Sequence, residues 1–225
     1  MSALHTAIKQ FDGSDEKKEE ISFALNLLEE LAKAKCDRFK IDVKELHEKA
    51  RNKENDQLPV QYEIYSHSES RAYKKDSQDN LPNSVSDAVR KFVSGGSDNI
   101  INGISNLVTS TLNILLPEGD GQMEEQNIYA CYVGDFAVAR LDIMLWRKSV
   151  EALSISQHIE KCIAYYAVES SIDVEVLDLN TFLLMFEKGL KNIDLNESEI
   201  QTERQRAIDM YIQLGGGGGS NPSQG

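Results

Sequence analysis

Apolar positions along the chain recur mainly with the three- to four-residue spacing of amphipathic helices. The clearest case is Ser14–Lys35, where Leu and Ile line one side and Glu and Lys occupy the opposite side. Residues that favour helix N-termini, such as Asp42 and Asn196, each followed three residues later by Glu, open further helical patterns. The additional helices predicted in this way span about 42–51, 84–93, 154–166, 180–190 and 196–211.

Two longer apolar segments lie in the middle of the chain. Asp98–Leu116 has helical spacing and ends sharply at Pro117. Glu124–Val150 is apolar on nearly all sides, which predicts a helix at the centre of a bundle. Ile128–Val133 also fits a buried strand, and Gly134 weakens the helical pattern.

Extended structure is predicted only in short stretches. Val60–Ile64 alternates apolar and polar residues and indicates a short edge strand, whereas Ser66–Asn80 is polar and indicates a mobile surface loop. The predicted fold class is therefore all-α, a multi-helix bundle of about six to eight helices with one or two short extended segments.

Composition shifts along the chain predict four parts. They are an N-terminal helical segment at 1–57, a mobile linker with a short strand at 58–83, an apolar helical core at 84–214 and a flexible Gly-rich tail at 215–225.

Charge narrows the choice of partners. The 225 residues carry 37 acidic and 24 basic side chains, a formal net charge of -13, so a polyphosphate would be repelled and nucleic-acid binding is not expected. The first ten residues lack the pattern of a secretory signal, and three widely spaced cysteines do not suggest a disulfide framework. We therefore expect a cytoplasmic protein, with release by a leaderless route left open.

The distribution of charge is more unusual than its sum. Residues 92–139 contain no Lys or Arg, and Asn99–Pro117 contains no charged residue of either sign. An ordinary surface helix carries Glu and Lys on its outer side, whereas this helix carries Asn, Ser, Thr and Gly. The residues predicted to form an interaction or membrane face are Ile100, Ile104, Asn106, Leu107, Ser110, Leu112 and Leu115.

Three interpretations of this helix compete. It could lie at the centre of the bundle with its amides bonded to neighbours, or pack against other copies of the protein, since small uncharged residues permit close helix contact. It could also leave the bundle and enter a lipid bilayer, with the flanking carboxylates acting as a low-pH trigger.

Three charged residues interrupt the apolar segment that follows. Buried charges must be paired, so Asp135, Arg140 and Asp142 are predicted to form internal ion pairs rather than a reactive site. The sequence contains no spacing of His and Cys or His and carboxylate that suggests a metal site, and no nucleotide-binding motif. No cofactor is expected.

These patterns predict a non-enzymatic interaction protein that self-associates or docks another protein through the uncharged helix. The first alternative is a membrane-active helical protein in which this helix inserts together with Glu124–Trp146. The second alternative is a carrier or enzyme that uses an aromatic-lined interior, which would require a pocket open to solvent.

Overall fold

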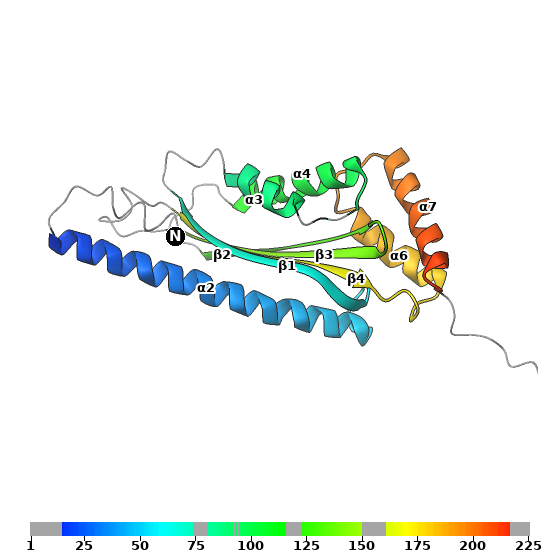
Figure 1. Ribbon diagram of the computed structural model, residues 1–225, viewed down its shortest axis with the longest axis horizontal. Coiled ribbons are helices and arrows are strands. Elements are labelled where there is room, and N and C mark those ends of the chain that lie inside the picture. Colours follow the sequence, from blue (N-terminus) through cyan, green and yellow to red (C-terminus); the bar gives the residue numbers. More distant parts are fainter. Residues whose placement is uncertain are drawn as a thin grey trace, which may run out of the picture.

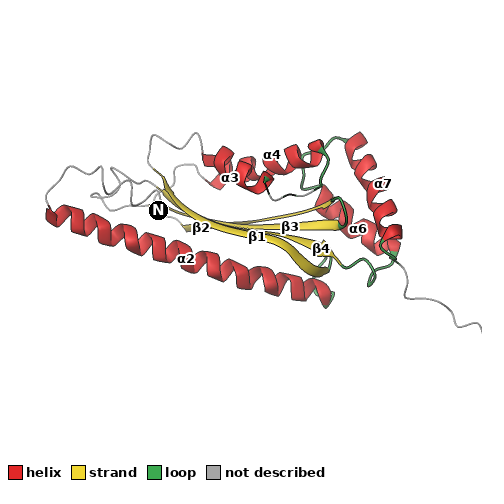
Figure 2. Cartoon of the chain, in the orientation of Figure 1, coloured by secondary structure: helices red, strands yellow, loops and turns green. Residues whose placement is uncertain are grey.

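A computed structural model describes residues 15–73, 81–91, 93, 95–115, 123–149 and 161–216. Within these ranges the chain forms five helices and one four-stranded antiparallel sheet, arranged as helix, sheet and helices in three layers (Figure 2). The all-α bundle predicted from the sequence is therefore wrong, and the fold is a mixed one of helices and strands.

All four strands pair antiparallel in the order β1-β4-β3-β2. The strands are β1 (Val60–Tyr73), β2 (Met123–Val133), β3 (Val138–Ser149) and β4 (Lys161–Ile172). A tight turn joins β2 to β3, with the Gly134 amide donating to the Ala137 carbonyl at 2.9 Å. The long β1 and the partly covered β2 form the two edges of the sheet.

The segment Glu124–Val150, predicted as a central helix, is the β2–β3 hairpin through residue 149. Its apolar pattern misleads because β3 is buried on both faces, with Leu141, Ile143 and Leu145 on one side and Met144 and Trp146 on the other. A strand buried in this way loses the alternation of apolar and polar residues on which strand prediction depends.

The helix predicted at 154–166 is also wrong where the structure describes it. Residues 161–172 form β4, a strand between β1 and β3 whose described side chains are all buried, and residues 150–160 lie outside the described residues. Strand β1 likewise continues through Ser66–Tyr73, the first half of the predicted loop, and residues 74–80 lie outside the described residues. The tail is described only to Gly216.

One face of the sheet is covered by α2 (Asp15–Arg51), a single helix of 37 residues (Figure 1). It joins the two helices predicted before and after Lys35, since the intervening residues include no Gly or Pro and Arg38 pairs with Asp42 one turn later at 2.8 Å. Its sheet-facing residues include Ala32, Phe39 and Val43, all buried.

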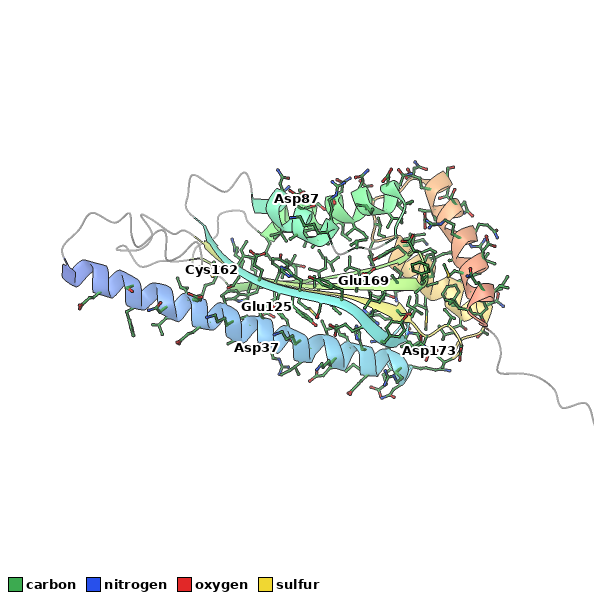
Figure 3. The ribbon with its side chains drawn as sticks, in the orientation of Figure 1. Asp37, Asp87, Glu125, Cys162, Glu169 and Asp173 are labelled. Atoms are coloured by element: carbon green, nitrogen blue, oxygen red, sulfur yellow. The ribbon has the colours of Figure 1, made fainter. Side chains whose placement is uncertain are left out.

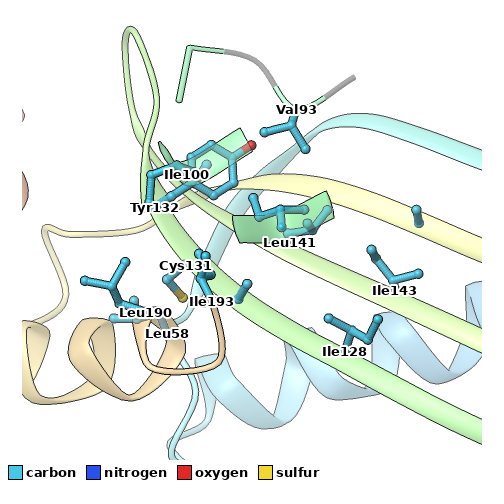
Figure 4. Packing of buried hydrophobic residues seen from close by; sticks show 14 of the residues in the cluster. Leu58, Val93, Ile100, Ile128, Cys131, Tyr132, Leu141, Ile143, Leu190 and Ile193 are labelled. Atoms are coloured by element: carbon cyan, nitrogen blue, oxygen red, sulfur yellow. The ribbon is translucent and has the colours of Figure 1, made fainter. Parts of the chain in front are cut away.

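Four helices lie on the other side and at one end of the sheet (Figure 1). They are α3 (Leu81–Arg90), α4 (Asp98–Leu115), α6 (Leu179–Leu190) and α7 (Glu197–Gln213). The predicted cap at Asn196 is present as a reciprocal pair of hydrogen bonds with Glu199. These helices and the sheet share the larger apolar core, in which Ile100 of α4 packs near Tyr132 of β2 (Figure 4).

Candidate functional site

Helix α4 has two chemically distinct sides. Its apolar side is packed into the core, where Ile100, Ile104, Val108, Leu112 and Leu115 are all fully buried. Of the residues predicted to form a contact face, Ile100, Ile104, Leu112 and Leu115 are therefore covered within one chain. Leu107 is partly buried, and only Asn106 and Ser110 are exposed.

The outward side of α4 is an uncharged polar strip. It is formed by Asn99, Asn102, Asn106, Ser110 and Asn113, all exposed, and Ile114 beside them is 72% exposed. Asn102 bonds to a neighbouring helix, where its Oδ1 accepts from Arg90 Nη2 of α3 at 3.2 Å. The Ser110 hydroxyl donates to the Asn106 carbonyl of its own helix at 2.7 Å. The strip is thus open to a partner. This differs from the interpretation in which the helix lies at the centre of a bundle with its amides bonded to neighbouring helices.

The structure brings Arg140 and Asp142 together on β3, facing α2, and both side chains are fully buried. Residues two apart on a strand point to the same side, which allows two hydrogen bonds of 2.6 and 2.9 Å between the guanidinium and the carboxylate. Asp135 is not part of this pair, since it is exposed in the turn between β2 and β3.

The Arg140–Asp142 pair is extended by groups from the end of α2 and the segment after it. His47 Nε2 lies 3.0 Å from Asp142 Oδ2, and Arg140 donates to the Leu58 carbonyl at 2.9 Å and to Gln57 Oε1 at 2.6 Å. The guanidinium also lies 4.9 Å from the ring centre of Tyr129. The bonds to His47, Gln57 and Leu58 fasten the end of α2 and the segment after it to the sheet.

Asp142 remains ionised in this buried setting. Burial opposes ionisation of the carboxyl, but the Arg140 charge and hydrogen bonds from His47 and Arg140 outweigh it and hold its pKa below the ordinary value. Arg140 and Asp142 are fully buried, so the chemistry of this pair fits a structural tie better than a reaction with a ligand.

The three cysteines are free thiols, and all three are buried. Cys36 of α2 donates to the backbone carbonyls of Glu69 and Tyr165. Cys162 lies in the core under α2, and Cys131 lies against Gly189 of α6, where an added Cβ would meet its sulfur at 2.6 Å. Burial raises the pKa of the Cys131 and Cys162 thiols to about 12, so neither is a nucleophile at neutral pH.

A polar cavity of about 540 Å³ lies between the start of α4 and α7. The loop 95–97 and Asn99 form one wall, and the α7 residues Ser198, Thr202, Glu203 and Arg206 form another. Glu203 is 3% exposed, and its Oε1 accepts hydrogen bonds from Ser97 Oγ at 3.0 Å and from Arg206 Nη1 at 2.7 Å. Its Oε2 is buried and accepts no hydrogen bond.

A second cavity of about 360 Å³ lies between α2 and the edge of β2, with Phe39, Leu46 and Met144 at its apolar floor. Glu125 at its rim lies between the sheet and α2 (Figure 3) and pairs with Lys35. Trp146, Tyr165 and Phe182, three of the central aromatic residues, are buried in the cores and line neither of these two cavities.

Two further predictions bear on the alternatives. Among the described residues no helix is long and apolar enough to cross a membrane, and the second helix of the predicted inserting pair is a β-hairpin. The all-α bundle is therefore corrected, and the pair of helices on which the membrane-active alternative was based is not formed as predicted. In the same residues no group of three His, Cys, Asp or Glu side chains is placed to hold a metal ion.

Comparison with known proteins adds no assignment. No protein-family model matches the chain, and neither the curated proteins nor the solved structures contain a match.

Two residues of these sites are not found by spacing alone. His47 meets Asp142 across 95 positions, and nothing local in the sequence marks this contact. Glu203 does carry a signal, because it falls on the apolar side of α7 between Ile200 and Ala207, where a charged residue is unexpected.

Proposed function

We propose that the chain is a non-enzymatic interaction protein that associates with a second copy of itself through the outward strip of α4. The observation that carries this proposal is the exposure of Asn99, Asn102, Asn106, Ser110 and Asn113 along one line of an otherwise acidic molecule.

Charge favours this surface over others for self-association. Each copy carries a net charge of -13, so most ways of bringing two copies together place carboxylates near carboxylates. The strip spans about 21 Å along the helix without a charged residue, from the 1.5 Å rise per residue. Two copies that meet there avoid direct like-charge contact.

The chemistry of the strip is also self-complementary. An Asn amide both donates and accepts hydrogen bonds, so the same group on two copies related by a twofold axis can bond reciprocally. Asn106 lies at the middle of the strip and would lie close to that axis. The short side chain of Ser110, which is exposed, allows a close approach of helices at this point of the strip.

The size of the strip sets the strength of the association. An 18-residue helix is about 27 Å long and presents a side about 10 Å wide, or roughly 270 Å² per copy. Stable dimers bury about 800 Å² per copy. We therefore expect a weak, reversible dimer that is populated only at high protein concentration.

Sedimentation equilibrium over a dilution series tests the proposal with two matched variants. Asn106→Lys places two ammonium groups near the proposed axis and should abolish the dimer, whereas Asn52→Lys adds the same charge at an exposed position after α2 and should leave it intact. A wild-type chain that is monomeric at every concentration would overturn the proposal. Equal dissociation of both variants, or a dimer that survives Asn106→Lys, would also overturn it.

A further inference from the structure

The cavity between α4 and α7 contains a carboxylate that the protein satisfies on one side only. Ser97 and Arg206 donate to Glu203 Oε1, while Oε2 is buried without a donor. A buried charged acceptor left without a hydrogen bond is costly, and native proteins normally supply a partner from protein, solvent or ligand. Because Glu203 lines the cavity, a molecule bound there can supply that partner.

The surroundings select a positively charged donor. Two carboxylates, Glu199 and Glu203, line the cavity against one guanidinium, that of Arg206. Glu199 Oε2 accepts from the backbone amide of Asn196. Glu203 Oε2 is the buried carboxylate oxygen that accepts no hydrogen bond. The net charge of -13 adds a long-range attraction for cations.

The opposite wall, which includes Gly95, Gly96 and Ser97, carries small residues before the start of α4. Gly95 has φ +72°, and a Cβ at this position would lie 2.2 Å from the Asp135 backbone nitrogen, so only glycine fits. Ser97 then caps α4 while its hydroxyl donates to Glu203. The volume of the cavity, about 540 Å³, lies within the range of small-molecule sites.

We infer that this cavity binds a small organic cation that carries a guanidinium or ammonium group, and that the cation donates to Glu203 Oε2. Ser97 and Arg206 retain Oε1, so the carboxylate is held in place before the cation arrives. The lining of the cavity shares Asn99 with the self-association strip, but binding of a cation to Glu203 does not depend on self-association.

An NMR titration of the full chain with methylguanidinium chloride tests this site, against sodium chloride at matched ionic strength and sodium acetate. The expected result is a saturable, millimolar interaction with methylguanidinium that shifts the amides of Gly95, Gly96, Ser97 and Thr202. Acetate should give no saturable change. Saturation by acetate but not by methylguanidinium, shifts spread without saturation over the acidic surface, or no response at all would each overturn the inference.

Three variants sharpen the test. Glu203→Gln removes the charge in a side chain of the same size and should weaken binding at least tenfold, because the charge-assisted hydrogen bond is lost. Glu197→Gln removes the same charge at an exposed position of α7 outside the cavity and should change binding less than twofold. Ser198→Trp fills the rim from an exposed position, so it should abolish binding even if Glu203→Gln does not fold. Unchanged binding in Ser198→Trp, or in a folded Glu203→Gln, would overturn the assignment.

Discussion

Helices α2 and α4 perform the same structural task on opposite faces of one sheet, yet their outer sides differ in kind. Each packs an apolar side against the strands, with Phe39 of α2 and Ile104 of α4 nearly or fully buried. The outer side of α2 carries ion pairs such as Lys33–Glu29 and Lys40–Asp37. The outer side of α4 carries none, because Asn99–Leu115 contains no charged residue.

This difference shows that covering the sheet does not require an uncharged helix. A charged outer side is compatible with the same packing in α2, and it also helps to keep a protein soluble. Packing within a single chain therefore does not explain why the outer side of α4 lacks charged residues. We propose that contact with a second copy explains it.

The largest expected effect concerns the inner side of α2, which is tied to the sheet by charges. Asp142→Ala leaves Arg140 buried without its carboxylate and should lower the free energy of unfolding by about 3–5 kcal/mol. Urea denaturation measures the change. The control Asp56→Ala breaks an exposed pair with Lys188 and should cost no more than about 1 kcal/mol. A loss below about 1 kcal/mol for Asp142→Ala would show that the network does not hold α2.

The next effect tests whether the inner sides of the two helices are equally well packed. Phe39→Ala should cost about 3–5 kcal/mol and Ile104→Ala about 2–5 kcal/mol, since both remove buried side chains and leave cavities. The same denaturation experiment compares them. A negligible cost at either site would mean that the corresponding helix is not firmly packed on the sheet.

Low pH should weaken the contacts that hold α2 to the sheet, because it protonates the Asp142 carboxylate. Because the pKa of this carboxyl is lowered in the folded chain, its contribution is present above the unfolded pKa of about 3.9 and is lost as the pH falls through the folded value. The stability difference between wild type and Asp142→Asn should stay constant from pH 7 to about pH 5 and shrink below about pH 4. A difference that already declines between pH 7 and pH 6 would assign the effect to another group.

The smallest effect on stability is expected when an ion pair like those of α2 is introduced on the outer side of α4. Asn102→Glu combined with Asn106→Lys builds an ion pair four residues apart on the exposed strip, and should change the free energy of unfolding by less than about 0.5 kcal/mol. The same double variant should remain monomeric in sedimentation equilibrium. If it destabilises the chain by more than about 2 kcal/mol, the outer side of α4 has a structural role within one subunit, and the comparison with α2 fails.

The helices could be predicted from the sequence more reliably than the strands, for a physical reason. The apolar side of α4 shows its period because only that side is buried, and the cap at Asn196 is local chemistry. Strand β3 has no such period, since Leu141 and Asp142 are both fully buried on opposite faces of the sheet. Gly134 and Asp135 lie in the turn between β2 and β3. These turn residues indicate the hairpin better than the many apolar residues around them indicate a helix.

The sites were less predictable than the fold because they join distant parts of the chain. Arg140 and Asp142 are neighbours on one strand, so their pairing follows once β3 is recognised as a strand. The contact of His47 with Asp142 and the cavity at Glu203 depend on how α2 and α7 lie against other elements. No periodicity within a single segment contains that information.

The labelling rates of the three buried thiols can report separately on the opening of the two helical layers. Cys36 and Cys162 are shielded where α2 meets the sheet, whereas Cys131 is shielded by α6. A thiol-modifying reagent can reach each sulfur only after its own cover has moved, because all three are buried in the folded chain. The labelling rate of Cys162 therefore measures how often α2 separates from the sheet, and the labelling rate of Cys131 measures how often α6 separates from it. Both rates can be measured in the same unmutated protein.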